Sequence, residues 1–309
     1  MRKKILLLAA FGLALALVAV GILAMMGFGY TAYRLAAMNP EYAYFDSDGV
    51  RIHYTVDGVG TPVILVHGLA INGGLNFRER DVVGALKDDY QVITLDNRGH
   101  GHSDKPHSSA SYGENLCDDI IRLMDHLQLE QAHVLGYSMG GFIVLKLAEL
   151  YPDRLLSFAC CAAGWTPRPE EEFDFFQALA DELDAGRGYG MLSERLTPIG
   201  REVSRRNRLR MSVGLWLIND NKAIAALLRS MPALVVEEAA LRQNEVPALA
   251  LVGDRDPLRP FTEKMAEITA NMTLTIVPDA DHMSTLRRTE AIDAIKAHLQ
   301  RHTPEATMR

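Results

Sequence analysis

The sequence predicts an α/β protein with a mostly parallel central sheet flanked by helices. After Pro40, short apolar runs alternate with stretches whose apolar residues recur at helical spacing, at 115–127, 142–150 and 292–300. The runs are bounded by glycine or polar residues and are largely apolar, as are strands buried on both faces of a parallel sheet. The 309 residues, of which 48% are apolar and 23% charged, are enough for a large core.

The expected sheet begins with a hairpin. Residues 42–45 and 51–56 flank the turn residues Asp48-Gly49, a pattern typical of two antiparallel strands. Six further strands are expected from the apolar runs at 62–66, 92–95, 133–135, 155–163, 248–252 and 274–277.

A helical insertion interrupts the alternation of strands and helices. Residues 165–220 contain no expected strand and are mixed in charge. We interpret them as a helical lid inserted at the carboxyl edge of the sheet, which leaves 39–164 and 221–309 as the core. The arginine-rich run at 205–210 is typical of a solvated helix face, with contact to anionic lipid heads as the alternative.

The N-terminal segment has the pattern of a membrane signal. Arg2, Lys3 and Lys4 precede an apolar stretch, and no charged residue occurs between Lys4 and Arg34. About 20 apolar residues span a bilayer as a helix, whereas the apolar core of a cleavable signal peptide has only about 7–15. We therefore expect residues 1–38 to be a transmembrane signal anchor and tether, with the remaining chain periplasmic or extracellular; secretion after cleavage is the alternative.

The composition argues against several partners and cofactors. The formal net charge of −7 does not favour nucleic acid, which needs a basic face. The cysteines, Cys117, Cys160 and Cys161, are too few and odd in number for a disulfide framework. No histidine and cysteine cluster has the spacing of zinc ligands, so no metal and no cofactor is expected.

The most specific motif is Gly136-Tyr137-Ser138-Met139-Gly140, between an expected strand and an expected helix. A sharp strand-to-helix turn of this kind holds a serine in strained backbone geometry and exposes its hydroxyl at a helix N-terminus. The glycines let the neighbouring chains approach closely enough to permit the turn. Ser138 is therefore the predicted nucleophile.

A serine nucleophile needs a histidine base and a carboxylate. The histidine removes the hydroxyl proton, and the carboxylate fixes the tautomer of the histidine. Of the ten histidines, His282 stands just past the last expected strand and is the predicted base. Asp254 and Asp256 both follow the preceding strand, and parity does not separate them because residues two apart share a face. Either acid gives the chain order serine, acid, histidine.

From about residue 42 to its end, the chain resembles the α/β-hydrolase family. The resemblance implies that Asp256, fourth in a G-x-x-D pattern, is the acid. It also implies that the backbone N–H groups of Leu69 and Met139 stabilise the oxyanion. The segments that carry it are the serine elbow and the loops 67–70 (HGLA), 96–103 (DNRGHGHS), 253–256 (GDRD) and 281–283 (DHM).

The resemblance further implies a carboxylesterase that acts on small or medium apolar esters through an acyl-enzyme. A serine nucleophile excludes the haloalkane dehalogenases and epoxide hydrolases of the family, which use aspartate. Lactonase, thioesterase, lipase and cofactor-free perhydrolase activities remain alternatives. Carbon–carbon bond hydrolases usually have tryptophan where this chain has Met283. A non-catalytic binding protein on the same scaffold is the alternative from another class.

Overall fold

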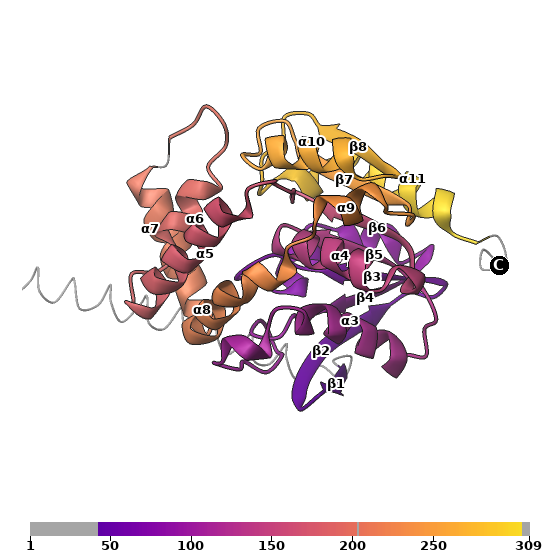
Figure 1. Ribbon diagram of the computed structural model, residues 1–309, viewed down its shortest axis with the longest axis horizontal. Helices are drawn as coiled ribbons and strands as arrows, with labels where there is room; N and C mark the ends of the chain where they lie inside the picture. Colours follow the sequence, from indigo (N-terminus) through magenta and orange to yellow (C-terminus); the bar gives the residue numbers. More distant parts are fainter. Residues whose placement is uncertain (1–42, 203, 305–309) are drawn as a thin grey trace, which may run out of the picture. The chain divides into compact units, whose positions relative to one another are not determined.

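The structure, a computed structural model, describes residues 43–202 and 204–304. Within these residues the core is built on an eight-stranded sheet (Figure 1). The strand order is β1-β2-β4-β3-β5-β6-β7-β8. The strands are β1 Ala43–Ser47, β2 Val50–Asp57, β3 Thr61–Val66, β4 Tyr90–Leu95, β5 Ala132–Tyr137, β6 Leu155–Cys161, β7 Ala248–Gly253 and β8 Met272–Val277.

The sheet is mostly parallel, as predicted. The β1–β2 and β2–β4 pairs are antiparallel, and the five remaining pairs of described neighbours are parallel. The β1–β2 hairpin turns at Asp48 and Gly49, whose φ angles are 56° and 79°. Positive φ at both central residues matches the right-handed twist of the flanking strands, which explains why this dipeptide closes the hairpin. Five of the six predicted apolar runs lie within one of β3 to β8, and the run predicted at 155–163 extends two residues past β6, which ends at Cys161.

Helices cover both faces of this sheet. Residues of α3, α4 and α10 share one apolar cluster with the sheet, whereas α2 and α11 share a second. The helices are α2 Val82–Leu86, α3 Asn115–His126, α4 Met139–Leu150, α9 Glu238–Arg242, α10 Arg259–Ile268 and α11 Thr289–His302. Short helical turns are η1 Gly74–Arg78, η2 Ser109–Ser111, η3 Pro152–Arg154, η4 Met231–Leu234 and η5 Thr285–Arg287.

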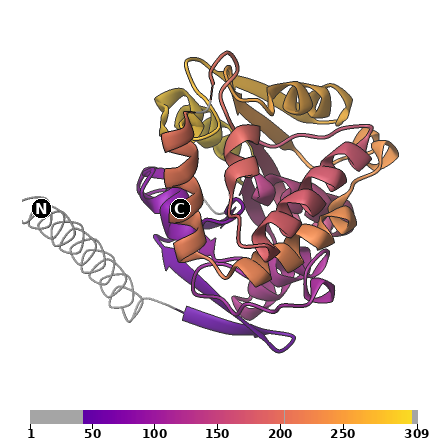
Figure 2. The same ribbon diagram turned by 90° about the vertical axis from the view of Figure 1, so that its left-hand side faces the viewer.

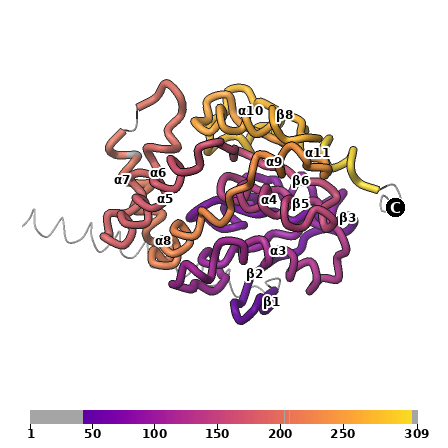
Figure 3. The backbone as a smooth tube through the Cα atoms, in the orientation of Figure 1, coloured from indigo at the N-terminus to yellow at the C-terminus, as the bar shows by residue number. Residues whose placement is uncertain are grey.

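Four further helices separate β6 from α9 and gather beside the sheet (Figure 1; Figure 2 views them from their own side). The chain enters this group after β6 and returns through α8 towards α9 (Figure 3). These helices have their own apolar cluster, in which α5 and α6 pack against α8. They are α5 Pro169–Asp184, α6 Gly190–Arg195, α7 Arg205–Ile218 and α8 Asn221–Ser230.

The predicted transmembrane helix is corrected. No helix in residues 43–202 and 204–304 is both long enough and apolar enough to cross a membrane. The segment for which the anchor was predicted, 1–38, lies outside the described residues. The described fold is the α/β core with its helical insertion, and the expected anchor and extracytoplasmic location are not supported.

Buried histidines make the stability of this fold depend on pH. His133 is 1% exposed; its Nδ1 lies 2.7 Å from the Ser157 hydroxyl oxygen and its Nε2 lies 3.0 Å from that of Thr303. Burial lowers the pKa of His133 from 6.5 to about 3. The unfolded chain therefore binds a proton more readily below pH 6.5, so stability is lost as the pH falls from 6.5 towards 3.

We expect urea unfolding at different pH values to show this loss of stability, and we expect a substitution of His133 to reduce it. At about 1.4 kcal/mol per pH unit, the His133 contribution to the free energy of unfolding should fall by about 2 kcal/mol between pH 7 and pH 5. His133→Gln should flatten this slope, whereas His107→Gln, at an exposed histidine, should keep it. An unchanged slope in the His133 variant would show that other groups carry the dependence.

Candidate active site

Ser138 stands at a strained turn between β5 and α4. Its φ is 54°, in the left-handed region that residues with a side chain rarely adopt. The turn is possible because the neighbouring glycines leave room. A Cβ on Gly136 would lie 2.1 Å from the carbonyl oxygen of Gly140, and a Cβ on Gly140 would lie 2.0 Å from that of Val66. The sequence thus places the Ser138 hydroxyl at the carboxyl edge of the sheet, at the N-terminus of α4.

The structure brings His282 and Asp256 to this serine from later loops. His282 Nε2 lies 3.1 Å from Ser138 Oγ, and His282 Nδ1 lies 3.0 Å and 3.2 Å from the Asp256 carboxylate oxygens. Asp256 is fully buried and His282 is 2% exposed. A carboxylate accepts only, so the imidazole carries its proton on Nδ1 and turns the Nε2 lone pair towards the serine. This arrangement is able to remove the proton of the Ser138 hydroxyl.

The two candidate acids have different surroundings. Asp256 Oδ1 also accepts the Leu258 N–H at 2.9 Å, which helps to fix the carboxylate. Asp254 Oδ1 instead accepts the Ala280 N–H at 3.1 Å. Backbone hydrogen bonds lower the pKa of Asp254. Asp254 therefore holds the loop after β8, while Asp256 contacts the histidine.

Several side chains hold the loop after β3, which contains Leu69. Asn76 Oδ1 accepts the Gly68 N–H at 2.9 Å, and His100 Nε2 accepts the Ala70 N–H at 3.0 Å. Asn219 donates to the carbonyl oxygen of Ala70 at 2.9 Å. The Leu69 N–H lies between two anchored peptides, close to the elbow. Its role and that of the Met139 N–H, at the start of α4, stay predictions.

Burial keeps the histidines of this loop neutral. His67 Nε2 accepts the Asn97 N–H at 2.9 Å, so its Nδ1 carries the proton and donates to the Gly68 carbonyl at 2.7 Å. Desolvation lowers the pKa of His67 and lowers that of His100 to about 3. The sequence did not indicate the contribution of His100, because it depends on a contact 30 residues away along the chain.

A small apolar cavity of about 40 Å³ opens at Ser138. Helices α5 and α6 supply much of its wall, including Phe176 and an ion pair between Glu172 and Arg195. Arg195 also lies 5.5 Å and 5.6 Å from the ring centres of Phe175 and Phe261. A second cavity of about 70 Å³ adjoins the first and shares part of its wall. The shared residues are Phe142, Glu172, Phe176 and Met231.

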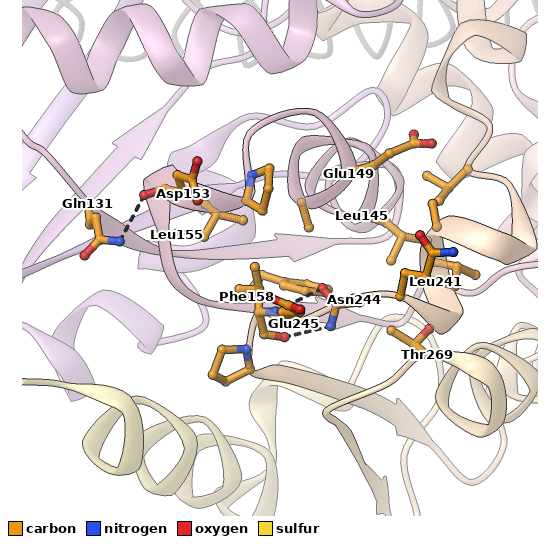
Figure 4. Close-up of a pocket in the computed structure, with 17 residues that line it drawn as sticks. Gln131, Leu145, Glu149, Asp153, Leu155, Phe158, Leu241, Asn244, Glu245 and Thr269 are labelled. Carbon is orange, nitrogen blue, oxygen red and sulfur yellow. Dashed lines mark hydrogen bonds between the residues drawn. The ribbon is translucent and has the colours of Figure 1, made fainter.

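A much larger cavity, of about 490 Å³, lies away from these residues (Figure 4). Leu155 and Phe158 of β6 and the residues just before β7 line it, so it lies at the amino ends of these strands. Ser138, Asp256 and His282 do not line it. We therefore place the chemistry at the smaller cavity. No cluster of metal-ligating side chains occurs in the described part of the chain.

The fold and the site together are typical of one class of enzyme. Enzymes of this class have a nucleophile elbow at the carboxyl edge of a mostly parallel sheet, and their acid and histidine lie on later loops. A sequence model of the alpha/beta hydrolase fold matches residues 61–288. The chain therefore belongs to the α/β-hydrolase fold family, as the resemblance implied.

Individual relatives differ in chemistry. A 3-oxoadipate enol-lactonase of Acinetobacter baylyi is 28% identical over 67% of this chain and 77% of that protein. A cis-3-alkyl-4-alkyloxetan-2-one decarboxylase of Shewanella oneidensis is 37% identical, over 36% of this chain and 35% of that protein, about a third of its length. The solved structure of a thermophilic esterase from Thermogutta terrifontis has a TM-score of 0.70 at 24% identity, over 85% of this chain and 99% of that chain. At that identity the likeness shows the fold alone.

Proposed function

We propose that this chain is a serine hydrolase that cleaves carboxylic esters through a Ser138, Asp256 and His282 triad. The observation that carries the proposal is the hydrogen-bonded series from Asp256 through His282 to Ser138, with separations of 3.0 Å and 3.1 Å. The series ends on a serine in strained geometry at a helix N-terminus, where developing negative charge is favoured.

The reaction follows from this geometry. Ser138 Oγ attacks the ester carbonyl while its proton passes to His282 Nε2, and Asp256 stabilises the imidazolium. The Leu69 and Met139 N–H groups donate to the carbonyl oxygen as it becomes an oxyanion. His282 then protonates the leaving alcohol and the carbonyl re-forms as an acyl-enzyme. A water molecule, deprotonated by His282, releases the acid and restores the serine.

A lactone is the second candidate substrate. A lactone is a cyclic ester, so the same steps open it and the alcohol stays attached to the acid. The relative named as an enol-lactonase supports this candidate. We propose that α5 and α6 act as the expected lid, because they line the cavity at Ser138.

The size of the cavity at Ser138 predicts the length of the acyl group. About 10–15 Å³ of such space holds one water-sized group, so 40 Å³ holds about three. We expect kcat/KM for nitrophenyl propionate to exceed that for the octanoate by about tenfold or more. Phe176 lines both this space and the adjoining 70 Å³ cavity. Phe176→Ala should therefore reduce the preference for the short ester, whereas Phe173→Ala, which enlarges the second cavity alone, should keep it.

The substrate class is tested with one panel of compounds. Esters, lactones and thioesters of similar short acyl length are compared by kcat/KM. We expect thioesters to have the lowest value and either esters or lactones to have the highest. A fluorophosphonate probe should label Ser138 covalently, as peptide mass analysis would show. Absence of both labelling and turnover would favour a binding protein on this scaffold over an enzyme.

A further inference from the structure

A buried arginine without a carboxylate partner contacts the loop that carries His282. Arg80, in the turn between η1 and α2, is 8% exposed. Within the described ranges no carboxylate lies within 4.0 Å of its guanidinium, and its Nε has no hydrogen-bond partner. Arginine is almost never buried unless it is paired, because removing its charge from water is costly. A buried arginine without an ion pair therefore points to a role other than stability.

Arg80 and Tyr137 hold two consecutive carbonyl groups of the histidine loop. Arg80 Nη1 donates to the carbonyl oxygen of Met283 at 2.9 Å. The hydroxyl of Tyr137 donates to the carbonyl oxygen of His282. The guanidinium carbon of Arg80 lies 5.5 Å from the ring centre of Tyr137, within the range of a cation–π contact. The two side chains thus support each other and the peptide that joins His282 to Met283.

The position of Tyr137 in the chain links the histidine loop to the nucleophile. Tyr137 immediately precedes Ser138, so one backbone segment carries both the nucleophile and the group that holds the histidine loop. Its ring lies 5.6 Å from the His282 ring, centre to centre. Within the histidine loop, Asp281 accepts the N–H groups of Met283 and Ser284, and Asp254 accepts the Ala280 N–H from the loop after β7. Those bonds shape the loop and hold it to the loop after β7, but they do not fix it to the elbow.

We propose that Arg80 and Tyr137 are positioning residues that keep His282 Nε2 within hydrogen-bonding distance of Ser138. The proposal rests on the proposed serine chemistry. Each of the two side chains holds one carbonyl of the segment that carries the imidazole: Tyr137 holds that of His282 itself, and Arg80 holds that of Met283.

Three variants test the proposal: Tyr137→Phe, Arg80→Met and Arg80→Lys. We expect Tyr137→Phe and Arg80→Met to lower kcat on the short ester about tenfold or more with KM within twofold. Arg80→Lys keeps a charged donor that can bond a backbone carbonyl, so it should recover part of kcat.

Two matched variants control for lost packing. Tyr112 is also a buried tyrosine whose hydroxyl donates to a backbone carbonyl, that of Pro106. Arg154 also donates to backbone carbonyls, those of Glu130 and Leu129, although unlike Arg80 it pairs with Asp125. Tyr112→Phe and Arg154→Met should keep kcat, even where they lower the melting temperature. A purely structural role for Arg80 predicts that Arg80→Met changes stability alone, with kcat unchanged, and that result would overturn the proposal.

A measurement that needs no substrate separates this proposal from the proposed function. The ring signals of His282, followed by NMR, should shift in Arg80→Met and shift less in Arg80→Lys. If the wild-type chain hydrolyses nothing in the ester panel, the proposed function fails while the NMR comparison still decides whether Arg80 positions the histidine. Unchanged His282 ring signals in Arg80→Met would reject that positioning.

Discussion

Replacing Ser138 with alanine should lower kcat on a short nitrophenyl ester by about four to six orders of magnitude. The loss is large because no other group replaces the attacking oxygen, and removal of a serine nucleophile costs about this much in comparable enzymes. His282 should then have no partner on its Nε2 side, where Ser138 Oγ lies at 3.1 Å. Steady-state kinetics with active-site titration by a fluorophosphonate would measure the loss.

The fold should survive this change, which makes the result interpretable. Alanine at φ 54° keeps the backbone strain of serine and removes one partly buried hydroxyl. Ser138→Gly relieves that strain and should raise the free energy of unfolding by about 1 kcal/mol while abolishing activity equally. Retention of more than about a hundredth of wild-type kcat in a folded Ser138→Ala protein would contradict acyl-enzyme chemistry.

The parts predicted from the sequence are those whose constraints are local. The elbow depends on Gly136 and Gly140, where any side chain would meet backbone within about 2 Å. The hairpin depends on Asp48-Gly49, and both residues take the positive φ that the turn requires. The parallel strands depend on apolar runs a few residues long. Each of these constraints lies within one short segment, so the sequence states it directly.

The parts that could not be predicted depend on contacts between distant segments. His100 holds Ala70 across 30 residues, and Arg80 reaches Met283 across 203. No periodicity in the chain indicates such pairs. The volume at Ser138 depends on how side chains of α5 and α6, Phe176 among them, pack over the sheet edge. The membrane anchor was predicted from an apolar run and the positive charges before it, and no helix of the described residues is long enough and apolar enough to cross a membrane.

The choice between Asp254 and Asp256 depends both on a local turn and on a contact with a distant segment. Parity could not decide it, because residues two apart on a strand would share a face. In the structure the Asp254 N–H still bonds to Val277 of β8, so residue 254 continues the sheet. The chain then turns, and the Asp256 carboxylate meets His282 Nδ1 at 3.0 Å. The family pattern pointed to Asp256, and a turn of two residues gives the physical reason.

Asp256→Asn should lower kcat by about three to four orders of magnitude with little change in fold. Asp256 Oδ1 accepts the Leu258 N–H at 2.9 Å, and an asparagine keeps that bond only through its carbonyl oxygen. Its NH₂ group then faces His282 Nδ1 and donates to it. The imidazole must move its proton to Nε2, where no lone pair remains to accept the Ser138 proton.

Asp254→Asn still offers an oxygen to the Ala280 N–H, so it should change kcat less than threefold and cost at most about 1 kcal/mol of stability. Kinetics and melting curves on both variants measure these effects, and a large kcat loss confined to the Asp254 variant would reverse the assignment of the acid.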